Sequence, residues 1–268
     1  MTTQTAESGG RITIPTFDLS GRVALLTGAS SGIGARWARL LAAAGARTVL
    51  CARRADRLDH IVEEVRAAGG AALAVATDVT DEASVIAAYD AAEAAFGTVD
   101  TIVANAGVGS GGPPEHQPLD TFDETVAINL RGVFLTVREG ARRLIASGSA
   151  EHGRGRIVIT SSIAAFDIAP GLAAYSGTKA AVLQMGKVMA RDWVRRGINV
   201  NMICPGYIRT DINADWFDSD GGKAQMAGFN RRRLAEQSDL DVALLWLASD
   251  LSRGVTGTAI AVDDGQSL

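Results

Sequence analysis

The chain has 268 residues with 26 Lys or Arg against 30 Asp or Glu, so its formal net charge is −4. With 47% hydrophobic and 21% charged residues it has ordinary globular composition, which excludes disordered and collagen-like chains. The mild acidity gives no reason to expect nucleic acid or an anionic membrane as partner, and no apolar run approaches the ~18 residues of a spanning helix. The polar N-terminus lacks the order of a signal peptide. The only cysteines, Cys51 and Cys204, are too few for a disulfide framework, so we expect a cytoplasmic protein.

Apolar runs of strand length alternate with helix-length amphipathic segments along most of the chain. Near-continuous apolar strands indicate a parallel sheet covered on both faces. The right-handed crossover rule then favours an α/β, single-domain Rossmann fold, a doubly wound parallel sheet of about seven strands. In chain order we expect strands at 22–27, 47–52, 71–76, 100–104, 156–160, 198–203 and 258–262, and helices at 34–44, 55–68, 81–96, 121–147, 173–195 and 239–249.

Two stretches fall outside this alternation. Residues 1–17 are interpreted as a loosely held N-terminal extension to a domain at 18–268. Residues 211–236 have no clean period, several charges and several aromatic side chains, so we expect an excursion from the core and a candidate lid over a site. Its apolar residues are either core packing or a wall for a substrate, and the lack of a regular period favours the wall. They are Trp216, Phe217, Met226 and Phe229.

A glycine-rich segment, T-G-A-S-S-G-I-G at 27–34, joins the first expected strand to the first expected helix. Glycine allows a tight turn and lets a pyrophosphate approach the backbone, while the helix N-terminus offers free N–H groups and positive potential. A Walker-type loop needs Lys and then Ser or Thr after the last glycine, where this chain has Ala35 and Arg36. The segment therefore favours a dinucleotide over a nucleoside triphosphate, with an ordinary strand-to-helix turn as the alternative.

The end of the second expected strand bears on which dinucleotide binds. An NAD site of this kind places Asp or Glu there to accept from the ribose 2′-hydroxyl. This chain instead has Ala52 followed by Arg53 and Arg54. Guanidinium groups suit a 2′-phosphate, although a solvated basic pair opening a helix would look the same. We predict a preference for NADP(H), with NAD(H) possible.

Tyr175 and Lys179 are four residues apart, so a helix would place both on one face. A phenol with its ordinary pKa near ~10 exchanges protons poorly at neutral pH, and a neighbouring cation lowers that pKa. The pair could therefore serve as general acid and base for a carbonyl or alcohol oxygen. Ser162 and Asn105 follow expected strands at the same sheet edge, and Asn129 is a polar residue among apolar neighbours that needs a buried partner.

Together these residues resemble the short-chain dehydrogenase/reductase family, of the common single-domain type. The resemblance covers about residues 18–265, and the chain departs from the family pattern at Asp264, where many relatives have a second glycine. It implies hydride transfer between NAD(P)(H) and a carbonyl or alcohol carbon. It also implies a homotetramer, or a homodimer, built through the helices that hold Asn129 and Tyr175. The motifs are T-G-x-x-x-G-I-G at 27–34, D-V at 78–79, N-A-G at 105–107, Asn129, Ser162, Y-x-x-x-K at 175–179 and P-G at 205–206.

The resemblance gives each matching residue a role. Tyr175 would be the acid/base, and Ser162 would hold and polarise the substrate oxygen. Lys179 would lower the pKa of Tyr175 and bond the nicotinamide ribose, and Asn129 would hold a water that relays protons. The cofactor-binding set is Gly28, Ser30 and Ile33 at the pyrophosphate with Ser31 in the same loop, Arg53 and Arg54 at a 2′-phosphate, Asp78 and Val79 beside the adenine, Asn105 and Gly107 along the ribose, Tyr175 and Lys179, and Pro205, Gly206, Ile208 and Thr210 around the nicotinamide.

The sequence therefore predicts an NADP(H)-preferring oxidoreductase that interconverts a ketone and a secondary alcohol. The residues expected near the reacting end are mostly apolar, which favours hydrophobic or bulky substrates. The scattered histidines lie at no metal-ligand spacing, so we expect no metal. One alternative is a 3-oxoacyl-thioester reductase that receives an acyl-carrier protein on a basic patch, and another is a non-catalytic NADP-binding sensor. The candidate patch is Arg131, Arg138, Arg142 and Arg143.

Overall fold

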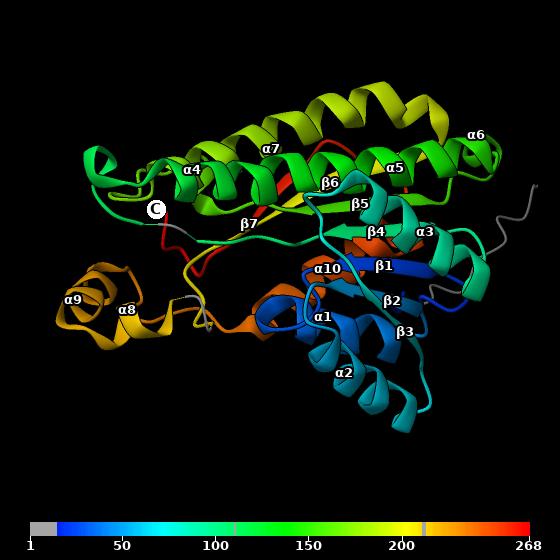
Figure 1. The fold of residues 1–268 in the computed structure, drawn as a ribbon, viewed down its shortest axis with the longest axis horizontal. Coiled ribbons are helices and arrows are strands. Elements are labelled where there is room, and N and C mark those ends of the chain that lie inside the picture. Colours follow the sequence, from blue (N-terminus) through cyan, green and yellow to red (C-terminus); the bar gives the residue numbers. More distant parts are fainter. Residues whose placement is uncertain (1–14, 110, 211–212) are drawn as a thin grey trace, which may run out of the picture.

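The computed structural model describes residues 15–109, 111–210 and 213–268, and its centre is a sheet of seven strands (Figure 1). All strand pairs are parallel, in the order β3-β2-β1-β4-β5-β6-β7. The chain thus starts in the middle, winds to one edge, and then returns to wind to the other. This confirms the doubly wound Rossmann sheet. The strands are β1 Val23–Thr27, β2 Arg47–Ala52, β3 Ala71–Ala76, β4 Thr101–Ala104, β5 Gly155–Thr160, β6 Ile198–Pro205 and β7 Ala259–Val262.

Helices cover both faces of the sheet because successive strand residues point to opposite sides and both sides are apolar. In β1, Val23 and Leu25 join one buried cluster while Ala24 and Leu26 join the other. None of the helices in these described residues is long and apolar enough to cross a membrane. One face is covered by α1 Gly32–Ala43, α2 Ala55–Ala67 and α10 Asp241–Ala248, and the other by α3 Glu82–Phe96, α5 Val133–Ala146 and α7 Ala173–Trp193 (Figure 1).

The long helix expected over 121–147 is interrupted. α4 spans Leu119–Val126, a π-helical turn occupies Ala127–Gly132, and α5 follows. A π turn holds one residue more than an α turn and is frequent at functional sites. This one contains Asn129. Apolar periodicity does not reveal such a shift in backbone hydrogen bonding, because the segment remains helical on both sides.

The excursion expected at 211–236 leaves the main body, but it is not irregular throughout. Residues 214–218 and 220–228 form α8 Ala214–Asp218 and α9 Asp220–Gly228, which stand apart from the helices on the sheet (Figure 1). Both helices are short, and α9 carries glycines in its first turn, so neither gave a clear helical pattern. Residues 211 and 212, and residues 1–14 of the expected extension, lie outside the described part of the chain. A further short helix, α6, spans Ser149–His152.

Substitution of Gly34 tests the packing of α1 against the sheet edge. A Cβ at Gly34 would overlap the carbonyl oxygen of Gly28, which is backbone and cannot move aside freely. We expect Gly34→Ala to lower the free energy of unfolding by about 1–3 kcal/mol, the usual cost of overpacking. Thermal and urea unfolding would measure it.

The matched control is Gly177→Ala. Gly177 also lies in a helix, α7, but a Cβ there meets open space. Alanine favours helix over glycine by about 1 kcal/mol, so this variant should unfold at the wild-type temperature or above. Equal losses in both variants would contradict the steric explanation.

Candidate active site

The predicted site residues gather at one edge of the sheet, where β1, β4, β5 and β6 end. Because these strands are parallel, their carboxyl ends lie side by side. Asn105 connects three of them: its amide nitrogen donates to the Thr27 carbonyl at 3.1 Å, and its amide oxygen accepts from Thr160 Oγ1 at 3.2 Å. Thr27 Oγ1 in turn accepts from the backbone N–H groups of Asn105 and Ala106, both at 3.1 Å. The ends of β1, β4 and β5 are therefore held in fixed register.

The glycine loop packs tightly on this edge. Gly28 has φ +69°, a left-handed conformation that favours glycine, and a Cβ there would lie 2.8 Å from the Cα of Ala106. Ser31 caps α1 without a side-chain hydrogen bond, and the first turn of α1 holds no acidic residue. The N–H groups of that turn are thus available to an anion. The residues present therefore fit the pyrophosphate of a dinucleotide.

Arginines flank the same loop at the end of β2. Arg54 donates to Ser30 Oγ and to Ser31 Oγ, both at 2.9 Å, while Arg53 is exposed. Hydrogen bonds from Thr80 hold the pKa of the Asp78 carboxyl below its usual range, and the positive charge of Arg53 lowers it further. Ala52 ends β2, so no carboxylate stands there. The loop is bordered by cationic groups on the side where a ribose 2′-substituent is expected.

Ser162, Tyr175 and Lys179 meet where β5 ends against α7. Ser162 Oγ accepts from the Ala164 N–H at 3.1 Å and hydrogen-bonds the phenol of Tyr175. Lys179 is 3% exposed; its Nζ donates to the Thr160 carbonyl at 3.0 Å and lies 5.5 Å from the centroid of the Tyr175 ring. A hydroxyl, a phenol and an ammonium group therefore surround one point at the sheet edge.

Burial is the main influence on the pKa values of Tyr175 and Lys179. It raises the pKa of Tyr175 above its ordinary value of 10.0, against the hydrogen bond from Ser162, which lowers it. Burial also lowers the pKa of Lys179 to about 8. The lowering of the Tyr175 pKa by Lys179 that the resemblance implies stays a prediction, since burial, which penalises the charged form of both groups, dominates here. Tyr175 is protonated at neutral pH.

Asn129 and Gly107 complete the cluster. Asn129 is fully buried, and its side chain pairs with the backbone of Val108: Nδ2 donates to the carbonyl at 2.9 Å and Oδ1 accepts from the N–H at 2.8 Å. A Cβ at Gly107 would lie 3.3 Å from Asn129 Oδ1 and 3.5 Å from Lys179 Nζ. Asn129 has the buried partner that its apolar surroundings require, and Gly107 lets it approach Lys179. The water that Asn129 would hold stays a prediction.

The remaining cofactor positions are partly or fully buried. Thr210 lies over the glycine loop, its methyl group 3.8 Å from a Cβ built on Gly32. Ile208 and Val79 are buried and Ile33 packs against the core, so their backbone atoms rather than their side chains would face a cofactor. Pro205 ends β6, and Gly206 follows it.

The C-terminal tail holds this last segment in place, which no motif signalled. Gln266 Oε1 accepts from the Tyr207 N–H at 2.6 Å, and its Nε2 donates to the Tyr207 carbonyl at 3.2 Å. Asp264, at the position where relatives have glycine, adopts φ +54° and pairs with Arg231 and Arg233. Gln266 is far from Tyr207 in the sequence, so no local pattern could have marked it.

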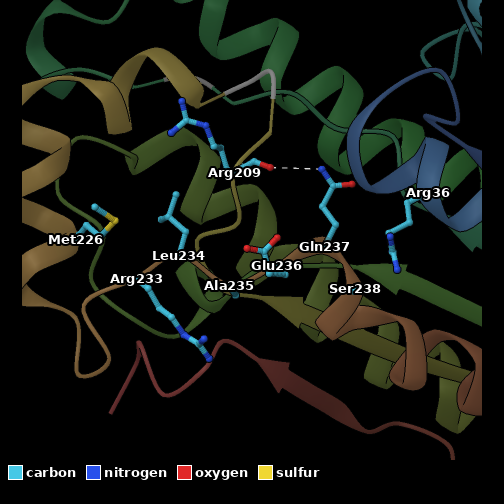
Figure 2. Close-up of a pocket in the computed structure, with 9 residues that line it drawn as sticks. All are labelled: Arg36, Arg209, Met226, Arg233, Leu234, Ala235, Glu236, Gln237 and Ser238. Atoms are coloured by element: carbon cyan, nitrogen blue, oxygen red, sulfur yellow. Dashed lines mark hydrogen bonds between the residues drawn. The ribbon is translucent and has the colours of Figure 1, made fainter.

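A surface depression of about 490 Å³ is lined by residues other than those of this cluster (Figure 2). Its arginines are each paired with an aspartate: Arg36 with Asp241, Arg209 with Asp218 and Arg233 with Asp264. None of Ser162, Tyr175 and Lys179 borders it. The candidate active site is therefore the cluster at the sheet edge. The residues that line the depression are Arg36, Arg209, Met226, Arg233, Leu234, Ala235, Glu236, Gln237 and Ser238.

Comparison with known proteins agrees with this arrangement. The short chain dehydrogenase family model matches residues 22–221. The chain is 36% identical to the 2,5-dichloro-2,5-cyclohexadiene-1,4-diol dehydrogenase of Sphingobium indicum, over 93% of this chain and 98% of that one. It is 36% identical to the D-threitol dehydrogenase of Mycolicibacterium smegmatis, over 94% and 95%. A crystal structure of a gluconate 5-dehydrogenase from Burkholderia cenocepacia, in complex with NADP and tartrate, has a TM-score of 0.87 at 35% identity, covering 93% and 96%.

The chain belongs to the short-chain dehydrogenase family. It is an oxidoreductase of that family, acting on substrates of the alcohol or ketone type with a nicotinamide dinucleotide as cofactor. The relatives differ in the substrates that their names give, so the family alone leaves the substrate open.

Replacement of the buried Lys179 should lower activity and should change how the stability of the protein depends on pH. Lys179→Met should lower turnover by about 10²–10⁴-fold, because proton transfer by Tyr175 would lose the charge that stabilises its phenolate. The folded-state pKa of about 8 lies below the unfolded value of 10.5, so between these values the unfolded chain binds more protons. Wild-type stability should therefore rise relative to the variant as the pH increases from about 8 to about 10. Melting temperatures across this range measure it.

Lys187→Met is the control for this experiment. Lys187 is on the same helix, α7, but is exposed. This variant should keep wild-type turnover, and its melting temperature should follow that of the wild type at every pH. A pH-independent difference between wild type and Lys179→Met would show that the amine is not held in its buried state.

Proposed function

We propose that the protein is an NADP(H)-preferring carbonyl reductase and alcohol dehydrogenase for hydrophobic or bulky substrates, with Tyr175 as general acid and base. The observation that carries the proposal is the convergence of Ser162, Tyr175 and Lys179 on one point of the sheet edge that also bears the glycine loop. Parallel sheets bind ligands at this edge. Exposed apolar side chains lie on two segments that follow strands of this edge, Phe166 and Ile168 after β5 and Trp216 after β6.

In the proposed reaction, each side chain acts on the substrate oxygen or on the proton. A bound nicotinamide supplies or accepts the hydride. Ser162 holds the carbonyl oxygen, and Tyr175, protonated because burial raises its pKa, donates a proton to that oxygen. The Lys179 ammonium then stabilises the phenolate that remains, since an opposite charge favours the ionised form. Asn129 holds the water through which the proton is replaced. In the oxidation direction the proton moves the other way.

The preference for NADP(H) is supported by the groups around the glycine loop. Arg54 already donates to the hydroxyls of Ser30 and Ser31, and Arg53 lies beside Asp78, so a 2′-phosphate would enter a cationic, donor-rich corner. Ala52 offers no acceptor for the 2′-hydroxyl of NAD(H).

Replacement of Arg54 tests this preference. Arg54→Ser should lower kcat/KM for NADPH by about 10–100-fold, because a hydrogen bond to a charged group contributes about 1.5–3 kcal/mol. The value for NADH should change much less. Arg57→Ser, which removes an exposed arginine from α2, the helix that Arg54 precedes, is the control. Equal losses with both cofactors would mean that Arg54 supports the loop and does not read the phosphate.

The thioester-reductase alternative receives less support. Its candidate basic patch is engaged in internal contacts: Arg138 pairs with Glu82, and Arg142 and Arg143 pair with Glu139. Arg143 also pairs with Asp90 and Glu93, and Arg131 donates to the Thr80 carbonyl. An acyl-carrier protein would have to displace these partners, so a ketone that is not attached to a carrier protein is the better-supported substrate.

The proposal also covers the oligomeric state and the cellular location of the protein. We propose a homotetramer, or a homodimer, because α4, α5 and α7 expose large apolar side chains that a subunit interface would cover. The two cysteines are free and buried, which fits the proposed cytoplasmic location. The exposed apolar residues are Leu119, Phe122, Phe134 and Val188.

The Tyr175→Phe substitution distinguishes the proposed enzyme from the alternative of a non-catalytic NADP-binding sensor. Tyr175→Phe should lower kcat by about 10²–10⁴-fold with ketones and NADPH, followed at 340 nm, while NADPH affinity measured by fluorescence stays within a few-fold. Tyr89→Phe is the control, since Tyr89 is also buried but donates to the Thr136 carbonyl within the helix layer. Wild-type turnover in Tyr175→Phe would overturn the assigned mechanism.

A further inference from the structure

Tyr207 occupies a fixed position between the catalytic cluster and the excursion. It follows Pro205 and Gly206, where the chain leaves β6. Its backbone is held on both sides, by Gln266 as described and by the Ala235 N–H, which donates to the Tyr207 carbonyl at 3.0 Å. The backbone at Tyr207 therefore cannot shift without breaking contacts to two other segments.

The ring of Tyr207 is enclosed by aromatic side chains of the excursion. It stacks on Phe229, with centroids 5.3 Å apart and planes inclined by 17°, and meets Phe217 edge-on, with centroids 5.7 Å apart at 73°. Both geometries are favourable for aromatic pairs. These two contacts fix the orientation of the ring and therefore the position of its hydroxyl.

The hydroxyl of Tyr207 has a defined polar environment. The Gln225 side chain hydrogen-bonds it. Gln225 Oε1 accepts from Trp216 Nε1 at 2.7 Å, so the amide group of Gln225 is oriented by a second aromatic residue. Tyr207 also lies close enough to Tyr175 to raise the pKa of that phenol when Tyr207 ionises. The Tyr207 hydroxyl and the Gln225 amide thus form a polar pair within electrostatic reach of the acid/base.

The charges near this pair disfavour an anionic ligand. The Asp167 carboxylate is near enough to raise the pKa of Tyr207, although burial is the main cause of that shift. Arg209 pairs with Asp218 at 2.6 Å, and Lys223 lies 4.0 Å from Asp220, so these two cations of the excursion are compensated. A carboxylate on the substrate would face Asp167 and lose its hydration, whereas a neutral hydroxyl could both donate and accept.

We propose that Tyr207 is a specificity-determining residue whose hydroxyl, with the Gln225 amide, binds a second and uncharged hydroxyl group of a cyclic or aryl ketone, remote from the carbonyl carbon. The inference rests on the proposed ketone reduction and adds the class of substrate. The partly exposed rings of Tyr207 and Phe229 would contact the apolar body of such a molecule, and the polar pair would bind the hydroxyl at its far end.

The test compares three ketones that share one ring: 4-hydroxycyclohexanone, 4-methylcyclohexanone and 4-oxocyclohexanecarboxylate. Wild-type kcat/KM with NADPH should be highest for the hydroxy ketone and lowest for the carboxylate. Tyr207→Phe keeps the ring contacts and removes one hydroxyl. It should lower the ratio of kcat/KM for the hydroxy ketone over the methyl ketone by about 3–10-fold, the effect of one net hydrogen bond. Gln225→Met should lower the same ratio.

Lys223→Met is the matched control, because it places the same new side chain on α9 at an exposed position near Gln225. It should keep the wild-type ratio, and melting temperatures check that all variants are folded. An unchanged ratio in Tyr207→Phe, or a wild-type preference for the carboxylate, overturns the inference but leaves the ketone reductase in place. If the wild type binds NADPH but reduces none of the three ketones, the proposed function and this inference both fail.

Discussion

The geometry of the candidate site depends on the register of three parallel strand ends, which the side chain of Asn105 connects by hydrogen bonds. Its amide bonds the Thr27 carbonyl on one side and the Thr160 hydroxyl on the other. The carbonyl of the same Thr160 accepts a hydrogen bond from Lys179, so these connections reach α7 and the catalytic cluster. A slip of one residue in any of these strands would turn the glycine loop or Ser162 away from the edge.

Near the strand ends that Asn105 connects, the protein keeps polar groups buried where the reaction needs them. Lys179 and Asn129 are almost without solvent contact, and both are held by backbone carbonyl groups. Burying an ammonium group is unfavourable, as the lowered pKa of Lys179 records. The gain is a site whose charges act in a poorly screened environment. The π turn at Ala127–Gly132 belongs to the same arrangement, since it is the segment that carries Asn129 to Val108.

Sequence reasoning succeeded where the signal is local or where several motifs share one edge. The strands at 47–52 and 71–76 were placed at their observed bounds, because short apolar runs ended by polar or glycine residues have little alternative. It placed the helical segment near 121–147 but did not reveal the π turn inside it, and it recognised the excursion at 211–236 without locating its two short helices. The four-residue spacing of Tyr175 and Lys179 also could not indicate that burial raises the pKa of the phenol, because spacing says nothing about depth.

The sequence by itself determined the fold class, the glycine loop and the identity of the residues that meet at the sheet edge, because each depends on residue type and short spacing. Only the tertiary structure decided which groups touch. It decided that Arg54 hydrogen-bonds the serine hydroxyls and that the arginines of α5 pair with carboxylates. It also decided that Gln266, from the distant C-terminal tail, hydrogen-bonds the backbone of Tyr207. Such contacts join segments far apart in the chain, and burial, which sets the pKa values of Tyr175 and Lys179, exists only once those segments have packed.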